Sequence, residues 1–192
     1  MTSAEREGVR IKRWTREEFE QAVRIFYEQR LELIDGGVMD KKGEEPSHDA
    51  CMERMADWLN GVFSERRVLR EARIDVAPAD NPANEPAPDF VALKRTMSYF
   101  LTTNPGPQDI LLVVEVAGQR TLRFDLKAKG ALYARAGIPE YWLADVAGRR
   151  LGVLREPRDG QYQLGVAYDA TESVAPLAAP ESFLRVADLF TL

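Results

Sequence analysis

The segment LLVVEVAG, residues 111–118, carries one acidic side chain, Glu115, inside an otherwise apolar run. A short run rich in Val and Leu is typical of a strand that is covered on both faces. An ionised carboxylate buried in such a strand loses hydration worth on the order of several kcal/mol unless it is paired or bound to a metal. The pattern therefore predicts that Glu115 has a cationic partner, lies at a strand end beside a cleft, or titrates.

The helix predicted over residues 121–136 offers a partner for this carboxylate. At 100° per residue, one narrow and mostly apolar stripe of the helix comprises Leu122, Leu126, Lys129 and Tyr133. Asp125 lies beside the stripe, and Lys127 points to nearly the opposite side. Because the helix follows the strand after a short turn, it should pack back across the sheet. We therefore expect Lys129, and not Lys127, to approach Glu115.

A second acid follows a proline. Asp89 comes directly after Pro88 and opens the segment PDFVAL, residues 88–93, which is otherwise apolar and predicts a short strand. If Asp89 and Glu115 lie at corresponding levels of neighbouring strands, their carboxylates meet. Mg²⁺ takes hard oxygen ligands at about 2.1 Å and keeps several waters. Two carboxylates and a lysine therefore predict a Mg²⁺ site, with Mn²⁺ as a substitute and with Asp89 and Glu115 as the metal ligands.

Each of these residues also has a purely structural interpretation. Glu115 and Lys129 form a structural ion pair if no metal binds. Asp89 then caps a turn, and the i,i+4 pair of Asp125 and Lys129 adds roughly 0.3–0.5 kcal/mol to an exposed helix. His48 is the single histidine, and it is a polar residue at a helix start as readily as a catalyst. The residue types and spacing alone leave these alternatives open.

Hydrophobic periodicity and turn signals give the elements that must position these side chains. Helices are predicted over residues 14–28, 48–64 and 121–136, and strands over residues 30–40 (with a Gly turn), 67–76, 88–93, 111–118, 140–146, 150–156 and 161–169. Thr15 and Glu18 have capping-box spacing at the first helix, and Ser47 is the predicted cap of the second.

This order of elements predicts an α/β (α+β) fold, in which a mixed central sheet is flanked by helices and followed by a C-terminal strand extension. A Pro-rich loop separates the strands on either side of residues 77–88. We expect one domain over residues 1–192, with its core at about 14–156 and a C-terminal tail at 170–192.

The overall composition restricts the class of protein. With 192 residues, of which 45% are hydrophobic and 30% charged, the chain suits a globular domain with one sizeable core. The net charge of −5 argues against broad non-specific binding of nucleic acid but is compatible with a local basic cleft. A single cysteine, Cys51, excludes an internal disulfide and a Cys-rich zinc site. Without an apolar run of about 18 residues or a signal-peptide core, we expect a cytoplasmic protein that makes no membrane contact.

Together, Asp89 after a proline, Glu115 in an apolar strand and a lysine further on resemble the PD-(D/E)XK nuclease superfamily. The likeness is greatest to its Uma-type branch, a bacterial restriction endonuclease family often described as a domain of unknown function. It extends from about Trp14 to Glu156, and the run LYARAGIPEYW, residues 132–142, is its most specific part.

The resemblance implies an αβββαβ core with the active site along the central strands. Asp89 and Glu115 would match the metal-binding carboxylates, and Glu32 would match a further acid at the edge of the site. His48 also matches a position near the site. These residues and Lys129 are the candidate catalytic residues.

Two departures from the pattern concern access and activity. Ala117 occupies the position two residues after Glu115 where the superfamily motif has its lysine. Members of the Uma-type branch resemble one another in carrying the lysine on the next helix, four residues after an aspartate, and Asp125 and Lys129 match that spacing. The loop MDKKGEEPSH, residues 39–48, is more charged than is usual in this branch. Such a loop could alter substrate access or mark a decayed site.

The leading hypothesis is a Mg²⁺-dependent endonuclease that hydrolyses phosphodiester bonds of DNA. Two carboxylates would hold the metal, and Lys129 would stabilise charge or orient the attacking water. A homodimer would suit cleavage of both strands, and we expect no organic cofactor. The alternative is a non-catalytic binding or assembly module that retains the nuclease fold. P-loop, dinucleotide-binding and GxSxG motifs are absent from the sequence, which disfavours other enzyme classes.

Overall fold

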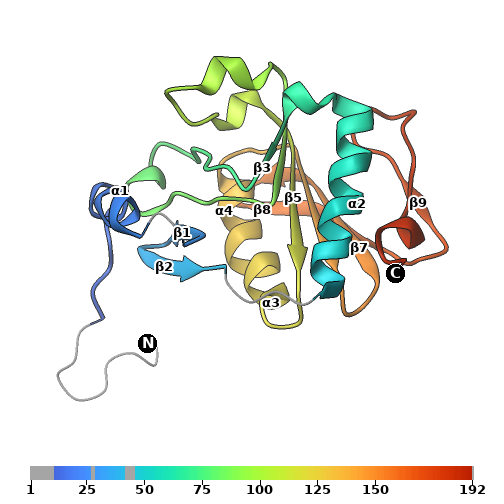
Figure 1. Ribbon diagram of the computed structural model, residues 1–192, viewed down its shortest axis with the longest axis horizontal. Coiled ribbons are helices and arrows are strands. Elements are labelled where there is room, and N and C mark those ends of the chain that lie inside the picture. Colours follow the sequence, from blue (N-terminus) through green and yellow to red (C-terminus); the bar gives the residue numbers. More distant parts are fainter. Residues whose placement is uncertain (1–10, 27–28, 42–45, 192) are drawn as a thin grey trace.

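A mixed β-sheet forms the centre of the protein (Figure 1). The computed structural model describes residues 11–26, 29–41 and 46–191. Within these residues the central sheet has six strands in the order β3-β4-β5-β6-β7-β8. They are β3 (Val68–Arg70), β4 (Phe90–Leu93), β5 (Ile110–Ala117), β6 (Glu140–Asp145), β7 (Arg150–Arg158) and β8 (Gln161–Tyr168). β5 and β6 run parallel, and the other neighbours pair antiparallel.

Helices cover both faces of this sheet. α2 (Pro46–Phe63) packs on one face, where Cys51, Met55 and Leu59 join a core cluster with Val114 of β5. The other face is covered by one continuous helical segment, made of α3 (Leu122–Phe124), a π-helical turn η5 (Asp125–Lys129) and α4 (Gly130–Arg135). Since successive side chains of a strand alternate between the two faces, residues 113, 115 and 117 of β5 point to this second helix. Glu115 is one of them.

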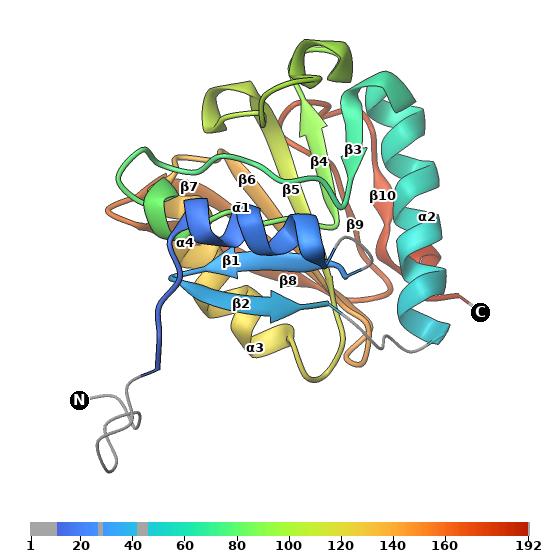
Figure 2. The ribbon, with the colours of Figure 1, turned by 60° about the vertical axis from the view of Figure 1, so that its left-hand side comes forward.

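A separate hairpin packs on the α3–α4 segment, where Ile34 clusters with Leu132. β1 (Leu31–Ile34) and β2 (Gly37–Asp40) are joined by the two-residue turn Asp35-Gly36. Both turn residues have positive φ, +47° and +72°, as a tight Asp-Gly hairpin turn requires. Figure 2 shows α1 (Arg16–Ile25) along this hairpin, where Phe19 packs with Leu31 and Leu33.

Short elements complete the fold. They are the 3₁₀ turns η1 (Glu65–Arg67), η2 (Asn81–Ala83), η3 (Met97–Phe100), η4 (Pro107–Asp109) and η6 (Val186–Leu189), and the strand pair β9 (Ser173–Val174) and β10 (Leu184–Arg185). Val174, Leu184 and Leu189 are buried against the α2 side of the sheet, so the C-terminal segment contributes to the core. Within the described residues, no helix has the length and apolarity needed to cross a membrane.

The predicted α/β class is confirmed, and α2, β3, β4, β5, the α3–α4 segment and β6 follow one another in the predicted αβββαβ order. The capping box of Thr15 and Glu18 is formed. The second helix, however, begins at Pro46, so Ser47 lies inside its first turn and is not its cap. Proline is favoured at the first helical position because its fixed φ suits the helix and its missing N–H is not needed there.

Two further predictions were wrong in detail. The strand predicted over residues 67–76 ends at Arg70, because Glu71 has a positive φ of +52° and turns the chain away from the ladder. Leu126 was expected on the inward stripe of the helix but is 46% exposed. It lies in the π-turn, where Gly130 donates its backbone N–H to Asp125 O. A π-turn takes more residues per revolution than an α-helix, so it rotates Leu126 outward and brings Asp125 inward.

Candidate active site

Glu115 is buried in β5, with 1% of its surface exposed, and it accepts hydrogen bonds from three side chains. Lys129 Nζ and Tyr133 Oη donate to Oε1 over 2.9 and 2.8 Å. Lys41 Nζ donates to Oε2 over 3.2 Å. The first partner is the lysine predicted from the helical face, and Lys127 is exposed as expected.

Lys129 connects Glu115 to two further acids. Its ammonium lies 2.8 Å from Glu32 Oε1 of β1 and 3.5 Å from Asp125 Oδ1. Glu32 Oε2 in turn accepts the backbone N–H of Ala87, over 3.3 Å. All four charged groups are buried, and the lysine is fully so. The hairpin thus reaches the centre of the site through Glu32.

Asp89 stands just before β4 and next to Glu115. The antiparallel register pairs Phe90 with Val114, so the next step along both strands brings Asp89 and Glu115 to the same level. Asp89 Oδ2 accepts the backbone N–H of Val116 over 2.7 Å, which fixes the carboxylate against β5. The two carboxylates thus lie at corresponding levels of neighbouring segments, as the sequence analysis considered.

Lys41 lies between these two carboxylates, and sequence reasoning did not select it. Its Nζ donates to Asp89 Oδ1 over 2.8 Å, to Glu115 Oε2 over 3.2 Å and to the carbonyl of Ala87 over 3.1 Å. It follows β2 directly, and its side chain is 14% exposed. The unusual charge of the loop at 39–48 was the sequence signal that could have pointed to it.

His48 approaches the site from the opposite face of β5. It is buried on α2, and its Nε2 lies 2.9 Å from the carbonyl oxygen of Val116. Because a carbonyl oxygen only accepts hydrogen bonds, Nε2 carries the proton in this contact. Its Nδ1 lies 3.6 Å from Asp49 Oδ1. His48 therefore holds the backbone of Val116, the residue that also anchors Asp89. The other candidates, Glu32, Lys129 and Glu115, form one cluster, and Lys41 connects this cluster to Asp89.

The charges of this cluster do not balance. Among the described residues, the acids Glu32, Asp89, Glu115 and Asp125 contact two ammonium groups, those of Lys41 and Lys129, which leaves two negative charges in excess if every group is ionised. Burying an excess of negative charge is costly unless a further cation or proton compensates it. The cluster therefore favours an added cation or an added proton.

The pKa values reflect this competition. Burial raises the pKa of Glu115 from 4.5 to about 7, against the opposing effect of Lys129 and Lys41. Burial also opposes ionisation of Asp89, but Lys41 and Lys129 outweigh it and hold the pKa of Asp89 below its ordinary value. Burial disfavours the charged form of both lysines, yet the surrounding carboxylates raise their pKa well above the usual range. Both lysines therefore stay protonated. Burial also raises the pKa of Asp125, and with a pKa of about 7 Glu115 can take up a proton near neutral pH.

The carboxylate oxygens of this cluster are the type of ligand that a divalent cation such as Mg²⁺ takes. In the part of the chain that the structure describes, no group of three or more His, Cys, Asp and Glu side chains surrounds a single point. Mg²⁺ is commonly held by one or two carboxylates and several waters, so Asp89 and Glu115 would suffice as protein ligands. An ammonium already bridges their oxygens, which shows that the gap between them accommodates a cation.

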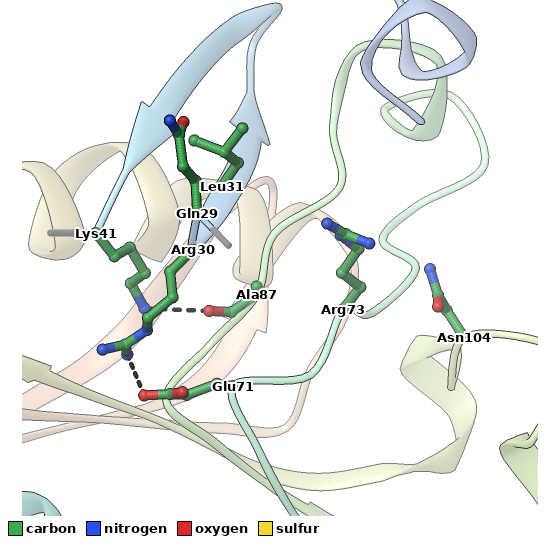
Figure 3. Close-up of a pocket in the computed structure, with 8 residues that line it drawn as sticks. All are labelled: Gln29, Arg30, Leu31, Lys41, Glu71, Arg73, Ala87 and Asn104. Carbon is green, nitrogen blue, oxygen red and sulfur yellow. Dashed lines mark hydrogen bonds and ion pairs between the residues drawn. The ribbon is translucent and has the colours of Figure 1, made fainter. Parts of the chain in front are cut away.

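A cavity lies beside Lys41 (Figure 3). It has a volume of about 380 Å³ and is lined by Gln29, Arg30, Leu31, Lys41, Glu71, Arg73, Ala87 and Asn104. Lys41 lines the cavity and contacts both Asp89 and Glu115. A larger hollow of about 750 Å³ elsewhere on the protein contains none of the candidate site residues.

Comparison with known proteins agrees with the fold. Residues 16–187 match the model of the Uma2 family, whose description is "Putative restriction endonuclease". The chain therefore belongs to the Uma2 family. A crystal structure described as "a putative nuclease belonging to DUF820", from Anabaena variabilis ATCC 29413, is similar in fold, with a TM-score of 0.64, 18% sequence identity, and coverage of 83% of this chain and 89% of that one. No curated protein matches the chain.

Proposed function

We propose that the protein is a Mg²⁺-dependent endonuclease that hydrolyses phosphodiester bonds of DNA. The observation that carries the proposal is the pair of buried carboxylates, Asp89 and Glu115, whose oxygens lie 2.8 and 3.2 Å from one shared ammonium group. Membership of the Uma2 family and the nuclease-like fold support the reaction class. Asp89 and Glu115 would hold the divalent cation, which when bound would activate water and offset charge on a phosphoryl oxygen.

The surrounding residues would orient this pair and supply charge. Lys129 stays protonated, so it would act as a fixed cation that stabilises negative charge or orients water, and not as a base. Glu32 and Asp125 hold its ammonium, and Tyr133 fixes one oxygen of Glu115. With its pKa raised to about 7, Glu115 can accept a proton near neutral pH.

His48 would act as a positioning residue. It contacts the backbone carbonyl of Val116, and the N–H of the same residue binds Asp89. Removing the imidazole would therefore let this part of β5 shift and misplace the carboxylate of Asp89.

A homodimer with one site for each strand would suit a protein that cleaves both strands of a duplex. The molar mass in solution tests that part of the proposal.

Titration calorimetry with Mn²⁺ tests the proposal on the wild type and the variants Asp89→Asn and Glu115→Gln. We expect the wild type to bind one or two ions and both variants to lose them, with loss of Mg²⁺-dependent cleavage of plasmid DNA. The matched control is Asp57→Asn, an exposed aspartate of α2 outside the site, which should bind and cleave as the wild type does.

The alternative, a non-catalytic binding module, has one observation in its favour. Glu115 and Asp89 are already paired with lysines, as a purely structural cluster would be. In that case no ion binds at any accessible concentration, and Glu115→Gln chiefly lowers thermal stability. Such a result would refute the enzymatic proposal.

A further inference from the structure

Lys41 and a metal ion would require the same space. The Lys41 ammonium lies 2.8 Å from Asp89 Oδ1 and 3.2 Å from Glu115 Oε2. Asp89 and Glu115 are also the carboxylates that would hold a Mg²⁺ ion, which takes oxygen ligands at about 2.1 Å. Two cations in one gap repel each other strongly, especially in a buried site where the effective dielectric constant is low. The ammonium must therefore leave before an ion can bind both carboxylates.

From this conflict we propose that Lys41 is a displaceable internal cation that moves between two positions. In one it closes the carboxylate pair of Asp89 and Glu115. In the other, after a divalent ion has taken its place, its ammonium turns into the neighbouring cavity and contacts a backbone phosphate of bound nucleic acid. The inference rests on the proposed nuclease function and assigns it a residue that competes with the metal and then binds substrate.

The burial of the two lysines explains why Lys41 is the one that moves. Lys129 is fully buried on the inward side of the helical segment and contacts Glu115, Glu32 and Asp125. It therefore cannot move outward without opening the core. The Lys41 side chain is 14% exposed and already lines the cavity. Its flexible four-carbon stem allows the ammonium to rotate outward about its side-chain bonds.

Other cationic groups around the cavity suit a phosphate. Arg30 and Arg73 both line it (Figure 3). Glu71 is the one acid among the lining residues, and it pairs with Arg30. Arg73 Nε lies 3.4 Å from Glu85, and its side chain is 34% exposed. A guanidinium or ammonium at such a cavity is a strong ligand for phosphate oxygens, and the rest of this acidic protein would repel them.

The cavity is connected to the two carboxylates through Lys41, which lines it and contacts both. Asp89 and Glu115 are each 1% exposed, so a phosphodiester cannot touch them while Lys41 stands in place. Displacement of one side chain by the ion would both load the metal site and open the path to it. The two events are thereby coupled through Lys41.

The first experiment measures Mn²⁺ affinity without nucleic acid. Lys41→Met removes the competing charge and keeps the length of the side chain, so we expect Mn²⁺ to bind about tenfold more tightly or better, as loss of an interaction worth about 1.4 kcal/mol would give. Lys127→Met, which removes an exposed lysine outside the cluster, should bind Mn²⁺ as the wild type does. Lys41→Arg keeps a cation at the site and should not gain affinity. If the methionine protein does not fold, Lys41→Gln removes the charge in its place and should show the same gain.

The second experiment measures binding of a fluorescent DNA duplex against salt. With a saturating divalent ion, Lys41→Met should bind DNA more weakly than the wild type, and the slope of log K against log salt should fall by about 1, the value for one lost phosphate contact. Arg73→Gln should do the same. In EDTA, where Lys41 pairs with the carboxylates, the wild type and Lys41→Met should have equal slopes.

The outcomes separate this inference from the function on which it rests. If the wild type and Lys41→Met bind Mn²⁺ equally tightly, or the variant more weakly, Lys41 does not compete with the ion and the inference is wrong, while the nuclease proposal stands. A slope that is unchanged with metal overturns the phosphate contact. If neither the wild type nor Lys41→Met binds any ion, the nuclease proposal itself fails.

Discussion

Lys129 and Glu115 form an ion pair in which neither partner has access to solvent: Nζ and Oε1 are 2.9 Å apart, and the two residues are 0% and 1% exposed. The pair joins the helical segment to the central strand of the sheet. It also lies within a cluster that has more acids than lysines. The stability of the pair therefore depends on whether a proton or a metal ion compensates the excess negative charge.

Lys129→Met should destabilise the protein strongly. The substitution leaves Glu115, Glu32 and Asp125 buried without their shared ammonium, and removing one partner of a buried ion pair costs about 3–5 kcal/mol. Lys127→Met removes an exposed lysine from the same helical turn and should change the free energy of unfolding by less than about 0.5 kcal/mol. Urea denaturation of both variants measures the difference. Equal stabilities would contradict the structural role of the pair.

The stability contributed by Glu115 should fall as the pH rises from about 4.5 to about 7. Burial raises the pKa of this carboxyl from 4.5 to about 7, so in this window the folded state binds more protons than the unfolded state, and the free energy of unfolding decreases with pH. Glu115→Gln resembles the protonated form and lacks this dependence. The advantage in stability of the wild type over the variant should therefore be greater at pH 5 than at pH 8, by up to roughly 3 kcal/mol.

Denaturant titrations of both proteins at the two pH values measure that difference. Asp89, whose pKa is held below its ordinary value of 3.8, should add no pH dependence in the same window. A wild-type advantage that grows toward pH 8 would show that the lysines dominate over burial at Glu115, and the assignment of the raised pKa would be wrong.

Several parts of this site could be predicted because each is a local break in a pattern. Glu115 is the acid in an apolar strand, Asp89 is the acid that opens another, and Lys129 is the lysine on an inward helical face. Each break reports burial of a charge, and burial requires a partner. The helical face was predicted correctly for Lys129 and wrongly for Leu126, because no feature of the sequence marked the π-turn between residues 125 and 129.

Lys41 could not be found in the same way. It follows an exposed strand end in a charged loop, where a lysine breaks no pattern. It contacts Asp89 and Glu115, which lie 48 and 74 positions further along the chain. These contacts depend on how the β1–β2 hairpin packs against the sheet. Periodicity reports which face of an element is buried, but it does not report which separate element covers that face.

Cys51 should be unreactive in the folded protein. The thiol lies at 0% exposure in the core under α2, and burial raises its pKa from 9.0 to about 12. The thiolate is the nucleophile, so at pH 8 a thiol reagent such as iodoacetamide should modify the native protein far more slowly than the protein in urea. Mass spectrometry of the alkylated protein follows both rates. Rapid modification under native conditions would mean that α2 opens locally.

Tyr133→Phe tests the hydrogen bond that fixes Glu115 without disturbing the packing of the ring. The hydroxyl donates to Glu115 Oε1 over 2.8 Å, and the ring packs edge-on against Tyr141 with 5.2 Å between the ring centroids. We expect a loss of about 1–3 kcal/mol in the free energy of unfolding, because a buried acceptor loses a donor. The bond favours the ionised carboxylate, so its loss should also raise the pKa of Glu115 further and weaken Mn²⁺ binding near pH 7.

Tyr162→Phe provides the matched control. Its hydroxyl donates to the backbone carbonyl of Ile138 over 2.9 Å, away from the carboxylates, so the variant should lose a similar amount of stability while its Mn²⁺ affinity stays that of the wild type. Calorimetric titrations of the two variants at pH 6, 7 and 8 distinguish the effects. Because deprotonation of Glu115 limits metal binding at low pH, the deficit of Tyr133→Phe should shrink as the pH rises. A deficit that is constant with pH would mean that Tyr133 positions the carboxylate without altering its pKa.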